Sequence, residues 1–426
     1  MKTFQKLAEK YGDVLCLKFR DDSVYFVNDP EVIKHILKTN YENYPRGKSI
    51  EDLKPLLGQG LFISEGELWK SQRKRLTPAF HNSQMESFYL TLNEELKLTN
   101  QLLEKAALNN QHVDLEYELK ILLLNLTIKN LVSSNTFVDT PTMLAGLSLI
   151  LTHTSNKQHY IRQILGLFQK KQLRIFDFKD TRAALNNLYN FSDRILDEVL
   201  NEKIKPGHLL SILIDAFKAG MISAQQVKDE IQTVLFAGYD TVAEGLLWLL
   251  YFLSKNEEAN KKVLEELTIL KMDFDLSKLG LNDTPYLTAT IRETLRLMPP
   301  AWSFYRTVKE TDSFNGYTFP RKAVIMISPY ILHRNKKYWN DAEVFNPGRF
   351  AGASEIDPFE YIPFGQGPHI CIGNRLALLE IHGIASTLLS KFKFNFVSPD
   401  KKIPETNPTV ILSSKKKVRV VIEKRQ

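Results

Sequence analysis

The chain has only two cysteines among its 426 residues, too few for a disulfide framework, as in proteins that fold in a reducing compartment. It also lacks long apolar runs. The longest, Leu246 to Leu253, is far shorter than the roughly 20 residues that a membrane-spanning helix needs. Met1 to Gln5 begin a polar segment without the apolar stretch of a secretory signal. We therefore expect a cytoplasmic protein without a transmembrane anchor.

Several motifs are absent as well. The sequence has no Gly-rich phosphate loop, no internal repeat, no flavin or iron–sulfur motif and no nucleic-acid-binding motif. Its net charge of +7 is spread along the chain, which fits an ordinary solvated surface or a basic patch for an acidic protein partner. No linker divides the sequence, so residues 1–426 are predicted to form a single domain with a large core.

Residues 1 to about 60 are the β-rich portion of the predicted fold, and the remainder is helix-rich. V-L-C-L-K-F and S-V-Y-F-V are strand-like runs that predict a hairpin, with Cys16 as a small core residue. Asp29 and Pro30 have the residue types that begin a helix. The stretch from 41 to 60 predicts a long functional loop. Further along, Asn315-Gly316 predicts a second hairpin.

A cysteine among glycines lies near the C-terminus. The segment from 363 to 375 reads P-F-G-Q-G-P-H-I-C-I-G-N-R, and Gly365, Gly367 and Gly373 permit positive φ and close approach of the backbone to a ligand. Apolar residues then recur at helical spacing, and a helix start behind Cys371 favours a thiolate. We interpret the segment as a thiolate presented to a large flat ligand. The alternative is a buried free cysteine in a Gly-rich turn.

Trp69 and Arg73 lie one helical turn apart in G-E-L-W-K-S-Q-R-K-R-L, and therefore on one helix face. An indole N–H and a guanidinium that point the same way form a fork for an anionic group such as a carboxylate. Tryptophan and arginine on a helix surface also occur for packing and solvation alone.

A helix of about thirty residues is predicted from Ser223 to Leu253. In its middle, F-A-G-Y-D-T-V departs from helix propensity, because Gly238 costs about 1 kcal/mol relative to alanine and the Thr241 hydroxyl can bond back to the carbonyl four residues earlier. A ligand such as dioxygen in the opened groove could receive a proton from Thr241, with Asp240 as the relay. The alternative is a kinked core helix with one polar turn.

The patterns W-x-x-x-R, A-G-x-D-T, E-x-x-R and F-x-x-G-x-H-x-C-x-G occur in this order between Trp69 and Gly373. They resemble the motifs of the cytochrome P450 superfamily, and the resemblance covers essentially the whole chain. It implies a mainly α fold with a small β-rich lobe, with haem b (iron protoporphyrin IX) between the long helix and the loop at 363–375, and Cys371 as the iron ligand. The other residues that it places around the haem are Trp69, Arg73, Ala237, Arg306, Phe364, His369 and Gly373.

The superfamily also has a buried Glu-Arg-Arg triad behind the haem loop. Glu293, Arg296 and Arg349 fill its three positions. The residue before the last arginine is commonly acidic in the family and is Gly348 here. We expect altered local pairing at this point.

The resemblance implies a monooxygenase that activates dioxygen and hydroxylates or epoxidises an apolar molecule such as a fatty acid, terpenoid or carotenoid. The segment around Trp69 is similar to the fatty-acid and long-chain hydroxylase branch, in a soluble, bacterial-type form. The alternatives are an isomerase, dehydratase or peroxygenase of the same fold, against which Asp240 and Thr241 argue, and a non-catalytic haem sensor. The residues that family position places in the substrate pocket are Leu57, Phe62, Phe236, Trp302, Phe304 and Val410.

Electrons must come from a separate protein, because the chain carries no second redox motif. A ferredoxin or flavodoxin is expected to dock on the cysteine side, with Lys70, Lys74 and Arg375 as candidate contacts. The aromatic and basic residues of 160–179 fit a channel lid, a membrane-touching surface or a solvated helix pair.

Overall fold

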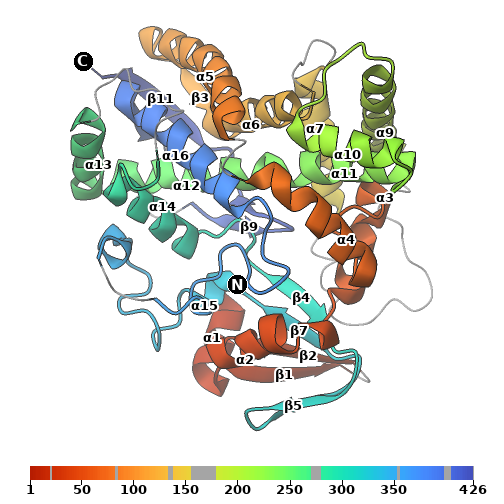
Figure 1. Ribbon diagram of the computed structural model, residues 1–426. Helices are drawn as coiled ribbons and strands as arrows, with labels where there is room; N and C mark the ends of the chain where they lie inside the picture. The colour runs from red at the N-terminus through yellow and green to blue at the C-terminus, as the bar shows by residue number, and fades with distance from the viewer. Residues whose placement is uncertain are drawn as a thin grey trace.

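The computed structural model describes residues 1–19, 22–81, 85–132, 138–154, 179–269, 280–352, 356–397 and 404–425. Nearly all of the segment 160–179, and its predicted role, lies outside these ranges. The described chain is mainly helical, as predicted. Its four-stranded sheet lies apart from the helix-rich body, whereas a three-stranded sheet packs against the helices. Figure 1 shows the four-stranded sheet at one end of the molecule beside the first two helices, with most of the helices at the other end.

The α-helices are α1 (Lys2–Tyr11), α2 (Pro30–Lys34), α3 (Lys54–Leu57), α4 (Gly66–Leu76), α5 (Met85–Leu108), α6 (Leu115–Val132), α7 (Thr140–Thr154), α9 (Lys179–Leu200), α10 (His208–Lys218), α11 (Ala224–Gly238), α12 (Asp240–Lys255), α13 (Glu257–Ile269), α14 (Pro285–Leu297), α15 (Pro329–Leu332) and α16 (Asn374–Lys391). The strands are β1 (Val14–Phe19), β2 (Asp22–Val27), β3 (His112–Asp114), β4 (Phe304–Thr307), β5 (Asp312–Phe314), β6 (Tyr317–Phe319), β7 (Val324–Ile327), β8 (Phe392–Phe396), β9 (Thr406–Pro408), β10 (Leu412–Ser414) and β11 (Arg419–Lys424). Short 3-10 or π-helical turns include η1 (His35–Thr39), η3 (Gly47–Leu53) and η8 (Pro347–Phe350).

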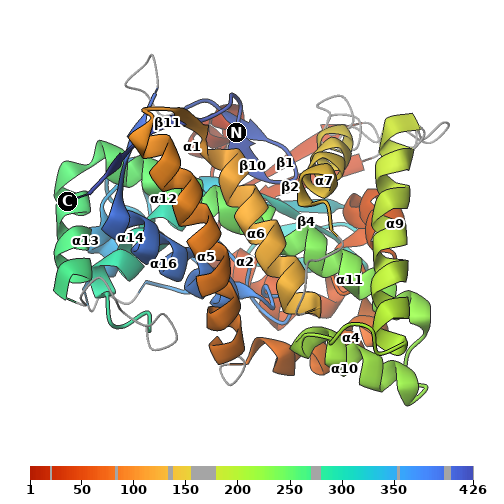
Figure 2. The same ribbon diagram turned by 90° about the horizontal axis from the view of Figure 1, so that it is seen from above.

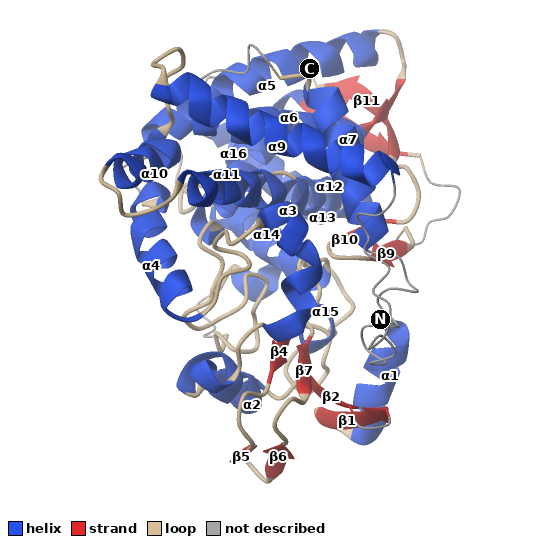
Figure 3. Ribbon diagram, turned by 90° about the vertical axis from the view of Figure 1, so that its right-hand side faces the viewer, coloured by secondary structure: helices blue, strands red, loops and turns tan. Residues whose placement is uncertain are grey.

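Both predicted hairpins are present. β1 and β2 pair antiparallel, and Asn315 and Gly316, with φ of 50° and 79°, form the turn between β5 and β6. The larger sheet has the order β1-β2-β7-β4, in which β2 and β7 run parallel. In Figure 3 these strands lie at one end of the molecule, and β11 lies at the other end, beyond the helices. The prediction for Cys16 is wrong: its side chain is exposed on β1, whereas its neighbour Leu15 points into the core.

The helix caps follow the predicted chemistry. The Asp29 carboxylate accepts hydrogen bonds from the backbone N–H groups of Glu31 and Val32, with Pro30 in the first turn of α2. The Ser223 hydroxyl accepts from the N–H of Gln226 and begins α11.

The predicted long helix crosses the core as two segments, α11 and α12, with Tyr239 between them. Of the described helices, only the run Ala224–Lys255 has the length and composition of a membrane span, and 78% of its apolar window is buried inside the protein. It is therefore the central helix of the core. Helices α6, α14 and α16 pack against α12, and in Figure 2 α5 and α6 lie over the central helix pair.

Candidate active site

The cysteine loop is a tight backbone turn in front of α16. The Cys371 N–H donates to the carbonyl of Phe364 at 3.0 Å. Gly365 and Gly367 have φ of 70° and 75°, the left-handed region that favours glycine. A Cβ atom at Gly367 would lie 1.9 Å from the carbonyl oxygen of Leu37, so the loop can approach η1 only because that position is glycine.

Gly373 differs from the other two loop glycines. Its φ is −89°, so the positive φ that glycine permits is not used at this position. Its N–H instead bonds to the Cys371 sulfur, and this bond and the charge of Arg73 lower the pKa of the thiol, whereas burial raises it more strongly. Cys371 is an exposed residue, although protein surrounds its thiol closely.

Helix α4 brings the predicted Trp69–Arg73 pair to the cysteine loop. The indole of Trp69 lies against the imidazole of His369, with ring centroids 3.8 Å apart. Arg73 donates from Nη1 to the carbonyl of Ile370 at 2.8 Å. The two predicted partners from one helix and the predicted histidine from the loop are therefore one assembly.

Arg46 completes this assembly, and our sequence analysis did not identify it. Its Nη2 lies 2.7 Å from Nδ1 of His369, and its Nη1 donates to the carbonyl of Phe62 at 2.6 Å. Because a guanidinium only donates, Nδ1 accepts and the imidazole proton is on Nε2. Burial, and then the charges of Arg46, Arg306 and Arg73, lower the pKa of His369 to about 2, so this imidazole is neutral.

The guanidiniums of Arg46, Arg73 and Arg306 surround the neutral His369. Burial, and then the charge of Arg46, lower the pKa of Arg306 to about 9. Glu65 is a carboxylate of this group, and its Oε1 lies 3.9 Å from Nε of Arg46. Guanidiniums bind carboxylates with paired hydrogen bonds, so the cluster fits the two propionates of a haem.

The central helix pair is open on one side of its break. The Thr241 hydroxyl donates to the carbonyl of Ala237 at 2.9 Å, the bond that the sequence predicted. Ala237 is exposed and Thr241 half-buried, whereas most residues of this helix pair are buried. Gly238 packs against α6, where an added Cβ would lie 3.1 Å from the Thr127 hydroxyl. The break thus presents a small residue and a hydroxyl to accessible space.

Asp240, the other predicted proton carrier, lies on the α6 side of the same turn. Its Oδ1 is 2.8 Å from Nζ of Lys120, and its side chain is almost wholly buried. The structure therefore places the predicted acid in an ion pair with a residue that our sequence analysis did not single out.

The loop before α4 is fixed to α11 through two carboxylates. Asp229 accepts the backbone N–H of Gln59 at 2.7 Å, and Glu230 accepts that of Leu61 at 3.0 Å. This arrangement positions Phe62, whose ring meets that of Phe236 edge-on with centroids 5.9 Å apart. Two of the predicted pocket residues, from a loop and from the central helix, are therefore neighbours.

The other predicted pocket residues have different surroundings. Trp302 donates from its indole N–H to the carbonyl of Thr409 at 2.7 Å, which brings the chain around Val410 close to it. The guanidinium of Arg306 lies over the Phe304 ring at 5.2 Å. Leu57 has no exposed surface and packs in the core, so it does not reach an accessible wall.

The predicted triad is assembled behind the cysteine loop. Glu293 binds Arg296 with two hydrogen bonds of 2.7 and 2.8 Å, and both side chains are completely buried. Nε of Arg349 lies 3.4 Å from the same carboxylate. At Gly348, where the family commonly has an acidic residue, the backbone N–H donates to the Asn346 side chain at 3.0 Å. Asn346 supplies the local pairing at this position.

His333 connects this triad to the cysteine loop, and the sequence carried no signal for it. Its Nε2 accepts the N–H of Ile362 at 2.9 Å, and its Nδ1 lies 3.1 Å from the carbonyl of Arg296. Burial and the charge of Arg296 lower the pKa of His333, so it is neutral and can donate from Nδ1 while accepting at Nε2.

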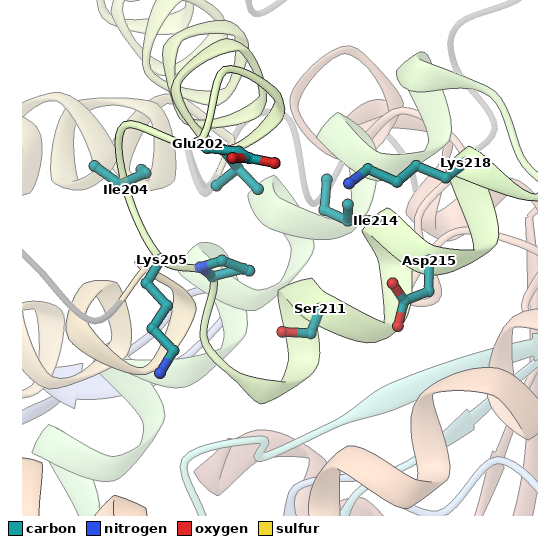
Figure 4. Close-up of a pocket in the computed structure, with 9 residues that line it drawn as sticks. Glu202, Ile204, Lys205, Ser211, Ile214, Asp215 and Lys218 are labelled. Carbon is teal, nitrogen blue, oxygen red and sulfur yellow. The ribbon is translucent and has the colours of Figure 1, made fainter.

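A separate pocket of about 340 Å³ lies between the end of α9 and α10 (Figure 4). Charged side chains of both signs line it, from Glu202, Lys205, Asp215 and Lys218. It shares no residue with the cysteine loop or with the central helix pair. We therefore assign no part of the active site to it.

The family model described as Cytochrome P450 matches residues 1–422. The chain belongs to the cytochrome P450 family. As a P450 it uses haem b, and the residues around Cys371 fit that cofactor. P450 enzymes are monooxygenases that require dioxygen, a substrate and a redox partner. A site of this kind accounts for the cysteine loop, the cationic cluster and the open turn of the central helix pair.

Three curated relatives illustrate the similarity. Probable cytochrome P450 4ac2 of Drosophila melanogaster is 29% identical over 395 residues, which cover 88% of this chain and 76% of the relative. Cytochrome P450 4F3 of Homo sapiens is 29% identical over 436 residues, with 96% and 82% covered. Human Cytochrome P450 4V2 is 28% identical over 394 residues, with 84% and 72% covered. These relatives come from animals, so the bacterial-type branch, the missing membrane anchor and the cytoplasmic location stay predictions.

Proposed function

We propose that this P450 hydroxylates or epoxidises an apolar small molecule such as a fatty acid, terpenoid or carotenoid, with electrons from a ferredoxin or flavodoxin. The observation that carries the proposal is the assembly of Cys371, on its glycine loop, with the cationic cluster of Arg46, Arg73 and Arg306. This combination provides a soft iron ligand and partners for two carboxylates in one site.

Each part of the site then has a defined task. Cys371 holds the iron, and the guanidiniums, together with the Nε2–H of His369 and the Trp69 indole, hold the propionates. When bound, the haem supplies the activation of dioxygen. Thr241 lies at the open turn, where its hydroxyl donates a proton to a ligand such as dioxygen.

The aromatic contact just before that turn supports the proposed substrate class. Phe62 is exposed, and its ring packs against the buried ring of Phe236, the residue before Ala237. An apolar wall favours a substrate whose hydrocarbon surface is removed from water when it binds. A screen of fatty acids, terpenoids, steroids and carotenoids by the Soret spin-state shift tests this. Shifts caused only by small polar compounds without a hydrocarbon chain, included in the screen as controls, would overturn the proposed class.

The thiolate assignment has a matched control within the chain. Reduced wild-type protein with carbon monoxide should show the red-shifted Soret band of a thiolate ligand, and Cys371→Ser should abolish it. Cys16→Ser, at the exposed cysteine of β1, should leave the band unchanged. Well-folded, haem-loaded wild-type protein without this band would contradict the proposed function.

The proposed redox partner docks on the cysteine side. Lys74 and Arg375 are exposed, whereas Lys70 pairs with Glu42 and Glu67 and has less free charge to offer. A surface pocket of about 380 Å³ beside the loop adds a concave surface there. Lys74→Glu and Arg375→Glu should slow reduction by the donor protein most strongly at low ionic strength. Rates that respond neither to these variants nor to salt would exclude an acidic partner on this face.

A further inference from the structure

The segment 58–62, hereafter the wall segment, is held along α11 by two neighbouring carboxyl groups. Asp229 accepts the backbone N–H of Gln59 at 2.7 Å, and Glu230 accepts that of Leu61 at 3.0 Å. Asp229 and Glu230 are buried, with 3% and 1% of their surface exposed. Because these bonds go to the backbone, they set the path of the wall segment along the helix.

Two glycines let the wall segment approach this helix closely. A Cβ atom at Gly58 would lie 2.2 Å from the carboxyl group of Asp229, and one at Gly60 would lie 2.0 Å from the Thr233 hydroxyl. Only glycine, which has no Cβ, fits so near to another side chain. The wall segment is therefore docked on α11 at several points.

Phe62 is the residue through which this docking reaches the pocket. It follows Leu61 directly and is 37% exposed, and its ring meets the buried ring of Phe236 edge-on. Phe236 precedes Ala237, which lies at the open turn of the central helix pair. Arg46 of the cationic cluster donates to the carbonyls of Leu61 and Phe62 at 3.1 and 2.6 Å. The backbone before the Phe62 ring is thus bound through an N–H group by α11 and through its carbonyls by Arg46.

Glu230 is the titratable group of this arrangement. Burial raises the pKa of its carboxyl to about 7, with a smaller contribution from Asp229, against the Leu61 N–H and the charge of Arg75 from α4. Among the described residues, no further charged group acts on it. Its Oε1 is buried without a hydrogen-bond partner in this part of the chain, so an ionised carboxylate here is incompletely compensated. The docked wall segment therefore favours the neutral acid.

We propose that Glu230 is a positioning residue for substrate selection, which holds the wall segment on α11 and so fixes Phe62 beside the open turn. The inference rests on the proposed monooxygenase function and adds what sets the shape of the substrate. With the segment docked, Phe62 narrows the pocket and favours slender hydrocarbon chains over bulky molecules. Detachment of the segment brings Glu230 into water, where its carboxyl ionises, and lets the Phe62 ring leave Phe236.

A rise in pH favours the detached wall segment. In the docked segment the pKa of Glu230 is about 7, whereas hydration returns it to the usual 4.5. Docking is therefore strongest below about pH 4.5, weakens by up to about ten-fold for each pH unit up to 7, and changes little above that. From pH 6 to pH 8 the expected loss of docking is about ten-fold. The bonds of Arg46 do not titrate in this range, so the movement stays local to the segment.

The chain offers a matched control for the variant that removes this titration. Glu230→Gln keeps an acceptor for the Leu61 N–H and cannot ionise. Glu380 on α16 is also a buried carboxyl, and burial raises its pKa to about 8, but it lies outside the wall segment and α11. A general response of the fold to the ionisation of buried carboxyls predicts the same consequences for Glu230→Gln and Glu380→Gln.

Hydrogen exchange on haem-loaded protein measures the docking itself. In the wild type, amide exchange of the wall segment, corrected for the intrinsic rate at each pH, should rise about ten-fold from pH 6 to pH 8. It should stay constant in Glu230→Gln and rise as in the wild type in Glu380→Gln. Corrected exchange that does not change with pH in the wild type would overturn the inference.

Substrate selection is measured with two neutral probes, so that neither ligand titrates. Dodecan-1-ol is slender and testosterone is bulky, and the Soret spin-state shift gives a Kd for each. The ratio of the testosterone Kd to the dodecan-1-ol Kd should fall several-fold from pH 6 to pH 8, at most by the roughly ten-fold change in docking. Glu380→Gln should show the same fall and Glu230→Gln none. An equal fall in Glu230→Gln and in the wild type would overturn the role of Glu230.

A further variant detaches the segment without any titration. In Gly60→Ala the added Cβ collides with the Thr233 hydroxyl, so the ratio should be low at every pH. If Glu230→Gln does not load haem, the wild-type pH profile and Gly60→Ala still decide. A Gly60→Ala ratio equal to that of the wild type at pH 6 would contradict the proposed wall.

The outcomes separate this inference from the proposed function. If the thiolate band and the Soret shifts with apolar compounds are intact while exchange and the Kd ratio ignore pH, the positioning role is wrong and the monooxygenase assignment stands. Absence of the thiolate band in haem-loaded wild type overturns the proposed function, whereas amide exchange of the wall segment reports on Glu230 alone.

Discussion

Glu230 makes the stability of the fold depend on pH. Its carboxyl is buried on α11 and holds the backbone of Leu61, and burial raises its pKa from the usual 4.5 to about 7, a shift that the Leu61 N–H partly opposes. Since the folded-state pKa exceeds the unfolded one, protonated Glu230 contributes to the free energy of unfolding. This stabilisation is fully present below about pH 4.5 and is lost as pH rises through about 7. Ionisation of Glu230 therefore works against the folded state.

Glu230→Gln should remove that dependence, because the amide oxygen still accepts the Leu61 N–H. Relative to wild type, the variant should gain up to about 3 kcal/mol between pH 5 and pH 8. Thermal unfolding across this range measures the difference. Glu9→Gln, at an exposed position of α1, should show no such trend. A constant difference in Tm between Glu230→Gln and wild type at all pH values would contradict the assignment.

Thr241→Ala tests the hydroxyl at the open turn. Without it, reductant consumption should continue while product per reductant falls by about ten-fold or more. Thr294 on α14 makes the same bond to a carbonyl four residues earlier, at 2.9 Å, but is buried. Thr294→Ala should lower Tm and leave coupling unchanged. Equal coupling in Thr241→Ala and wild type would exclude Thr241 from proton delivery.

The cationic cluster shows which neighbouring side chains can be predicted from the sequence. Trp69 and Arg73 could be paired because a helix fixes their relative positions, and His369 because it lies two residues before Cys371. Arg46 lies in the predicted loop, where no periodicity fixes a direction, and its partner is 323 residues away. Only the folded backbone brings such a pair together.

Among the elements, the cysteine loop allows a comparison of two glycines. Gly365 and Gly367 share a left-handed φ, but a Cβ at Gly365 meets nothing within 4 Å, whereas at Gly367 it meets the backbone of Leu37. Gly365→Ala should cost only the conformational term of about 1–2 kcal/mol and keep the thiolate band. Gly367→Ala should reduce haem loading and the thiolate band strongly. Similar Tm values and spectra for the two variants would contradict the close approach to η1.

The central helix pair marks another limit of pattern reading. The sequence located the weak point, because glycine and a back-bonding threonine stand together in F-A-G-Y-D-T-V. It did not show that the helix is divided at Tyr239, since apolar residues continue with helical spacing on both sides. It also did not show that Asp240 faces Lys120, because that contact depends on how α6 packs on α12.

Across the whole molecule, Glu293 joins segments that are distant in sequence. It binds Arg296 of α14, lies beside Arg349 and accepts the backbone N–H of Asn346 at 2.9 Å. Glu293→Gln would leave buried guanidinium charge uncompensated and should cost about 3–5 kcal/mol, seen as a large fall in Tm and loss of bound haem. The exposed pair Lys261–Glu265 is the control, and Glu265→Gln should leave Tm unchanged. A small effect of Glu293→Gln would show that the triad does not hold the fold together.

The parallel pairing of β2 with β7 has a consequence for biosynthesis. Val24 pairs with Val324, so a ribosome must add 300 residues before the partner strand exists. At about 5–20 residues per second this takes roughly 15–60 s. During that interval β2 has a strand edge open to other chains, and a nascent chain that stalls before β7 keeps it open. Slower elongation should therefore increase aggregation of the newly made protein, whereas faster completion or a chaperone that covers the hairpin should increase its yield.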